Sequence, residues 1–95
     1  LFITMERTMA LGAWLDCGMF MQNIMIVARA FGLETCPQQA WCDVGAVVHG
    51  ELGIADSHIL LSGMALGRID PDAPENTLVS ERAAVDDFAI WHCRD

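Results

Sequence analysis

Several residue types are absent from this chain or scarce in it. Its 95 residues include no lysine and no tyrosine, and five arginines stand against thirteen acidic residues, for a net charge of −8. The arginines are scattered, whereas binding to nucleic acid or to anionic lipid depends on clustered positive charge. Nucleic acid and membrane surfaces are therefore poor candidates as partners.

Motifs for several kinds of chemistry are also missing. The sequence has no glycine-rich phosphate loop, no Ser-His-Asp grouping and no arguable pair of catalytic carboxylates. Five residues separate Cys36 from Cys42, which is wider than the usual zinc spacing and is not a C-x-x-C redox pair. His49, His58 and His92 stand at no recognisable ligand spacing and are expected in the core or on the surface. We predict no metal site and no catalytic side chain.

The N-terminal residues bear on the cellular location. LFITMERT contains neither a basic region nor a small-residue cleavage site, so it does not resemble a secretory leader. We expect free cysteines in a reducing cytosol, and hence a cytoplasmic protein. The chain lacks an initiator methionine and begins inside an apolar pattern, which indicates a piece of a longer protein.

Apolar residues are abundant for a chain of this size. They make up 54% of the sequence, against 19% charged residues. A small domain has much surface for its volume, so part of this apolar surface needs a cover. A second subunit, a missing part of the same chain or a membrane would each provide one.

The segment AWLDCGMFMQNIMIVARAFGL, residues 13–33, is the strongest structural signal. Its length and periodicity predict a helix over residues 13–32, with Gly32 as the stop. A membrane span is the alternative, but four polar residues are spread through the segment: Asp16, Gln22, Asn23 and Arg29. Most of the remaining circumference is apolar, which is typical of a helix buried between two layers. We expect the same helix of a second subunit to form one of them.

Shorter segments complete an α/β pattern. Their composition and periodicity predict a strand at 1–6, a helix at 40–51, a strand at 58–67 and a helix at 83–92. Gly63, inside the second strand, indicates that another group approaches the backbone closely. The order of the elements predicts a mixed α/β layer structure.

The segment Pro37-Gln38-Gln39-Ala40 connects the two central helices of this prediction. On its residues alone it is a turn. A proline ring nevertheless offers a flat apolar face, and the peptide N–H groups after it precede a helix, which suits a planar heterocycle with ring nitrogens. Arg82 is the only arginine between residues 69 and 93, and it either balances the nearby acids or binds a phosphate.

Five segments occur in a familiar order: LFIT, WLDCGMFMQNIMIVARAFGLETCPQ, GELGI, LLSGMALGRIDPDAPEN and SERAAVDDF. Together they resemble the C-terminal half of the flavin-dependent nitroreductase family, in its nitrobenzoate-reductase-like branch. The resemblance extends over essentially the whole chain. It implies a nitroreductase-like three-layer sandwich, present here as a partial domain. It also implies a homodimer through helix 13–33, with FMN bound in the subunit interface.

The resemblance further implies roles for individual residues. Pro37 and Gln38 would pack on the isoalloxazine ring, and backbone N–H groups at Gln39–Ala40 would approach its N5 atom. Arg82 would reach the FMN phosphate. Ser80 stands where the family often has a second cation, which implies a weaker grip on that phosphate. Many members have Glu-Gly in place of Gln39–Ala40, but a backbone donor tolerates that change.

The implied activity is hydride transfer from NAD(P)H to flavin, followed by reduction of a nitroaromatic, a quinone or a similar small-molecule acceptor. The cofactor carries the chemistry, so no side chain needs to act as a base. The alternative is a truncated relative that self-associates without flavin or turnover. This flavin-free alternative is considered because the family's main phosphate-binding motif lies in the N-terminal half, which the resemblance does not include.

Overall fold

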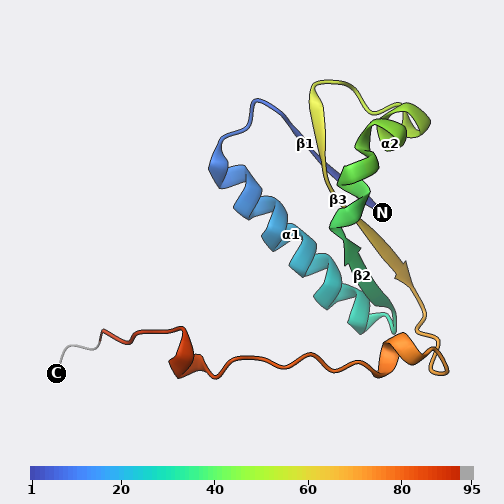
Figure 1. Cartoon of the computed structure of the whole chain (residues 1–95). Helices are drawn as coiled ribbons and strands as arrows, with labels where there is room; N and C mark the ends of the chain where they lie inside the picture. Colours follow the sequence, from blue (N-terminus) through green and yellow to red (C-terminus); the bar gives the residue numbers. More distant parts are fainter. Residues whose placement is uncertain (93–95) are drawn as a thin grey trace.

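A computed structural model describes residues 1–92 of the chain (Figure 1). It contains three strands, two α-helices and three short 3₁₀ helices. In chain order they are β1 (Phe2–Glu6), α1 (Leu11–Ala30), β2 (Glu34–Gln38), η1 (Gln39–Val44), α2 (Gly45–Leu52), β3 (His58–Gly67), η2 (Pro74–Thr77) and η3 (Val85–Asp87).

The strands form one antiparallel sheet with the order β1-β3-β2, so the last strand in sequence lies in the middle. The pairing of β1 with β3 shifts once: Ile3 pairs with Ser62, but Thr4 pairs with Leu60. Leu61 therefore has no partner on β1 and forms a bulge, which locally bends and twists the strand. Most of the small core surrounds this part of the sheet: Ile3, Met5, Leu60, Ser62, Met64, Ala28 and Val48.

Helical elements cover both faces of the sheet. A side chain at Gly63 would meet the ring of Trp41 in η1, whereas Leu66 shares an apolar groove with residues of α1. Successive side chains of a strand point to opposite faces, so residues 63 and 66 lie on opposite faces of β3. The layers are therefore α1, the sheet, and η1 with α2. The predicted mixed α/β fold and its partial-domain character are confirmed by the match to known structures reported below.

Helix α1 ends by a mechanism that the sequence had indicated. Gly32 has a φ of +66°, which glycine adopts without steric penalty. The N–H of Leu33 donates to the carbonyl of Ala28, and the N–H of Gly32 to that of Arg29, which is the Schellman arrangement. The guanidinium of Arg29 also pairs with Glu34, the first residue of β2. The helix begins at Leu11, two residues before the predicted start.

Helix α1 is largely uncovered in the single chain, so its predicted burial against the same helix of a second subunit stays a prediction. Among its residues only Ala28 is buried. Cys17, Met21, Ile24 and Met25 are half-buried, whereas Leu15, Met19 and Ile26 are 72%, 59% and 59% exposed. The reason is that one chain supplies one packing layer, the sheet, and leaves the opposite side uncovered. By length and composition α1 is also able to cross a membrane.

Three predicted secondary-structure elements need correction. Residues 34–38 form an edge strand, β2, which was not predicted and which includes the first two residues of the turn expected at 37–40. The predicted helix 40–51 is divided into the 3₁₀ helix η1 and the α-helix α2. The predicted helix 83–92 is reduced to the three-residue η3. Strand β3 spans the residues predicted for it, 58–67.

The third correction has a clear physical cause. After β3 the chain leaves the sheet and runs in extended form below the C-terminal end of α1 and away from the sheet (Figure 1). An amphipathic helix of this length depends on packing for its stability, and the segment has no such surface. Its large apolar side chains are at least 70% exposed in five cases: Leu78, Val79, Phe88, Ile90 and Trp91. The radius of gyration, 17.3 Å, exceeds the roughly 13 Å of a compact domain of this length.

Candidate functional site

The candidate site begins on the edge strand β2. Pro37 pairs with Met64 and Gln38 pairs with Gly63, both on β3. Proline lacks an N–H donor and is therefore confined largely to sheet edges, where one side of the strand needs no partner. Pro37 and Gln38 are both exposed, whereas Met64 beneath them is 2% exposed. The sheet thus presents the proline ring to solvent on a rigid support.

The next residues, Gln39 and Ala40, open the 3₁₀ helix η1. No side chain caps this helix, and its first N–H groups have no partner within it. Within residues 1–92 neither N–H group donates to a turn or loop carbonyl, and both residues are exposed. The exposed ring of Pro37 is therefore followed closely in the chain by the backbone N–H groups of Gln39 and Ala40, which are available as donors.

Trp41 completes this group of residues. Its Nε1–H donates to Oε1 of Gln38 at 3.2 Å, and its ring lies against the backbone of Gly63. The ring of Phe2 meets it edge to face, with centroids 5.2 Å apart and an interplanar angle of 87°. We did not predict a role for Trp41. One indirect signal was present. Gly63 predicted that another group lies close to the strand backbone, but did not identify that group as the ring of Trp41.

The two cysteines that flank this segment do different things. The thiol of Cys42 donates to the carbonyls of Leu60 and Leu61 at 3.3 and 3.2 Å, and so satisfies the backbone at the bulge. Cys36 is exposed on β2. Both are free, as is Cys17, while Cys93 lies outside the described residues. In residues 1–92 no group of three or more His, Cys, Asp or Glu is placed to hold a metal ion.

Arg82 and Ser80 lie elsewhere, on the extended segment after η2. Nη1 of Arg82 donates to Oγ of Ser80 at 2.5 Å, and to the carbonyls of Ser80 and Glu81 at 3.4 and 3.1 Å. All these contacts are local, and the segment runs away from the sheet (Figure 1). The predicted site residues therefore form two separate groups in one chain: residues 37–40 on the sheet, and the pair Ser80 and Arg82 on the segment.

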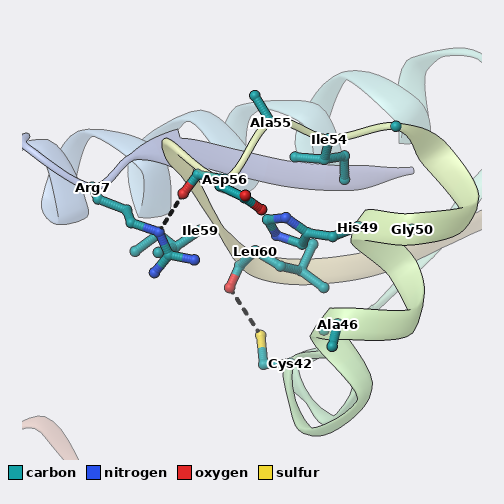
Figure 2. A pocket seen from close by; sticks show the side chains of 12 residues that line it. Arg7, Cys42, Ala46, His49, Gly50, Ile54, Ala55, Asp56, Ile59 and Leu60 are labelled. Carbon is teal, nitrogen blue, oxygen red and sulfur yellow. Dashed lines mark hydrogen bonds between the residues drawn. The ribbon is translucent and has the colours of Figure 1, made fainter.

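A broad hollow lies beside α2 (Figure 2), and its lining includes Cys42 and His49, neither of which was predicted as a site residue. Its volume is about 860 Å³, and His49 projects into it from α2. At its rim, Nε of Arg7 donates to the backbone carbonyl of Asp56 at 2.7 Å. None of the six predicted site residues lines it.

A second hollow, of about 370 Å³, lies between α1 and the end of β3. Its lining is almost wholly apolar and consists of Phe20, Asn23, Ile24, Val27, Ala28, Phe31, Leu33 and Leu66. This hollow adds to the apolar surface that the single chain leaves uncovered around α1.

Known proteins match this chain over nearly its whole length. A family model described as "Nitroreductase family" matches residues 3–68. The nitrobenzene nitroreductase of Ectopseudomonas oleovorans is 34% identical over 91 residues, covering 96% of this chain and 40% of that protein. The 4-nitrobenzoate reductase of Pseudomonas putida is 34% identical over 88 residues, covering 93% of this chain and 39% of that protein.

Solved structures agree with the sequence matches. The FMN- and NADPH-dependent nitroreductase NfnB from sphigopyxis sp. strain HMH superposes with a TM-score of 0.92 at 38% identity. The match covers 98% of this chain and 42% of that one. The FMN-dependent NfnB from Mycobacterium smegmatis, solved with NADPH, has a TM-score of 0.90 at 24% identity, which supports the fold alone.

This chain spans about 40% of the length of the relatives that it matches. The expectation that it corresponds to their C-terminal half stays a prediction. The family resemblance itself is confirmed, because the family model covers more than half of the chain and relatives with about one-third identity cover nearly all of it. The chain belongs to the nitroreductase family.

Proposed function

We propose that this chain is part of an FMN-dependent NAD(P)H oxidoreductase that reduces nitroaromatics, quinones or similar acceptors. Its family membership and the FMN- and NADPH-dependent neighbours support the proposal. The observation that carries it in this chain is the exposed ring of Pro37, followed directly by the uncapped start of η1.

These residues suit the isoalloxazine ring of FMN. The ring of Pro37 gives its planar system an apolar contact, and N–H groups at Gln39 and Ala40 supply donors for ring acceptors. Bound FMN would supply the redox chemistry between NAD(P)H and the acceptor, so the residues of this chain would contribute binding, orientation and electrostatics. No ionisable side chain is needed beside the ring.

The phosphate of FMN would be held by Arg82. A guanidinium forms paired, charge-assisted hydrogen bonds with phosphate oxygens, and Ser80 adds only a neutral hydroxyl. Arg82 and Pro37 belong to separate groups in one chain, so we propose that the flavin pocket is completed in a subunit interface. The exposed position of the segment that carries Arg82 is consistent with this arrangement.

We propose a homodimer in which helix 13–33 packs against a second copy. Leu15, Met19 and Ile26 form an exposed apolar strip on the side of α1 opposite its half-buried residues. Removal of such a strip from water stabilises an assembly by about 25 cal/mol per Å² of apolar surface buried. The free thiols of the described cysteines support our proposal of a cytoplasmic location.

A second candidate function is a self-associating module without flavin or turnover. One observation favours it: the two groups of predicted FMN residues lie apart in the single chain (Figure 1). The two candidates agree on self-association and differ on flavin binding alone.

Titration of FMN into the purified protein distinguishes them. We expect quenching of flavin fluorescence on binding, and a dissociation constant raised about 10- to 100-fold by Arg82→Ala, the effect of losing hydrogen bonds to a charged group. Arg68→Ala is the matched control, since Arg68 is also exposed and lies just after β3. Failure to bind FMN at large excess would favour the flavin-free module. Equal effects of both substitutions would refute the role of Arg82.

A further inference from the structure

The side chain of Trp41 has a fixed place between the proposed flavin segment and the middle of β3. A Cβ atom at Gly63 would lie 2.2 Å from Cδ1, 2.8 Å from Cγ and 2.9 Å from Nε1 of Trp41. Among the described glycines only Gly32 and Gly53 have positive φ, so the backbone at Gly63 is ordinary. Glycine is therefore needed at position 63 because the indole ring occupies the space of a side chain.

Contacts from three strands hold the ring in place. Gly63 on β3 lies under it, Phe2 on β1 meets it edge to face, and Gln38 on β2 accepts its N–H. Edge-to-face geometry is the favoured arrangement for an aromatic pair, because the positive edge of one ring meets the negative face of the other. The indole position is thus set by the sheet and not by the short helix that carries it.

The polarity of the bond to Gln38 has a consequence. An indole N–H only donates, so the amide of Gln38 must present its carbonyl oxygen, Oε1, to Trp41. The Oε1–Nε1 distance of 3.2 Å fits such a bond. The amide nitrogen Nε2 is then left on the other branch of the side chain, where its two N–H groups remain as donors. Gln38 is exposed and follows Pro37 in β2, so the two side chains point to opposite faces of the sheet, and a ligand reaches both only across the open edge of the strand.

We propose that Trp41 is a positioning residue that orients the amide of Gln38, so that Nε2 donates to an acceptor atom at the rim of a heterocycle that lies across the open edge of β2. This rests on the proposed function. It implies selection for planar rings that present a carbonyl oxygen or an unprotonated ring nitrogen at that edge. Gly63 is the third member of the arrangement, because any side chain there displaces the indole.

A double-mutant cycle with FMN tests the proposal. Trp41→Phe keeps an aromatic ring but removes the donor, and it should weaken FMN binding about 2- to 10-fold, the effect of one neutral hydrogen bond. Gln38→Ala should weaken binding by at least as much, and adding Trp41→Phe to it should cause no further loss. Trp14→Phe, the same exchange on α1, should leave the dissociation constant unchanged. Equal losses from Trp41→Phe in both backgrounds would overturn the proposal, since Trp41 would then act independently of Gln38.

A measurement without flavin separates this proposal from the proposed function. In a nitrogen-15-labelled sample, Gln38→Ala should shift the indole N–H proton resonance of Trp41 upfield and leave that of Trp14 in place. An unmoved Trp41 resonance would overturn the bond and the proposal with it. A shifted resonance together with no FMN binding by any variant would refute the proposed function and the flavin role of Gln38, and would retain the orientation of its amide by Trp41.

Discussion

The replacement Gly63→Ala is a sharp test of how the sheet and η1 fit together. It adds one methyl group in the middle of β3, at a position where 2.2 Å separates the new atom from Cδ1 of Trp41. No two carbon atoms approach so closely without a bond, so either the ring or the strand must move. Trp41 is 40% exposed, which makes the ring the part that gives way.

The expected destabilisation follows from what the displaced ring loses. An aromatic edge-to-face pair contributes roughly 0.5–1.5 kcal/mol, and a neutral hydrogen bond about the same. Against this, alanine at an ordinary φ stabilises by about 0.4–1 kcal/mol, because it restricts the unfolded chain. The net result is a loss of about 1–2 kcal/mol in the free energy of unfolding, within the range for overpacked sites.

Urea unfolding followed by circular dichroism measures this change as a shift of the midpoint. Gly67→Ala is the matched control, since it lies in the same strand with nothing within 4 Å of the new Cβ atom. In a Trp41→Ala background, Gly63→Ala should reverse sign and stabilise by about 0.4–1 kcal/mol. The same loss in both backgrounds, or no difference from Gly67→Ala, would refute the explanation.

Two further predictions concern assembly and helix ends. Ile26→Asp places a charge in the exposed strip of α1 and should convert the dimer to monomer in light scattering, whereas Val47→Asp on α2 should not; an unchanged mass for Ile26→Asp would contradict the interface. At the end of α2, Gly53 has a φ of +63° and Gly50 does not, so Gly53→Ala should lower the unfolding free energy by about 1 kcal/mol and Gly50→Ala should raise it by about 0.5–1 kcal/mol. Urea midpoints that move in the same direction for both would disprove this assignment.

Much of the fold was predictable because its signals are local. The long apolar period and Gly32 predicted α1 and its end, and the buried run at 58–67 predicted β3. Strand β2 was missed because Pro37 and two glutamines have the composition of a turn, and only pairing with Met64 and Gly63 makes the segment a strand. Pairing partners distant in sequence leave no local trace.

The candidate site was predictable in part for a similar reason. Residues 37–40 were indicated by their own chemistry, and Gly63 by its position inside a strand. Trp41 was not, because its role depends on the simultaneous approach of β1, β2 and β3. The helix at 83–92 was predicted from its apolar period, but a short amphipathic helix needs a packing surface, and the local sequence does not show whether the chain supplies one.

The central place of β3 has a consequence for how the protein is made. Both other strands precede it in the chain, and the backbone bond between Leu1 and Met64 joins residues 63 positions apart. During synthesis β1 and β2 therefore leave the ribosome before the strand with which both of them pair in this sheet. Sheets that depend on such distant pairing form slowly and expose aggregation-prone edges meanwhile. The apolar strip of α1 also precedes β3 in the chain, so it is synthesised before the central strand of the sheet.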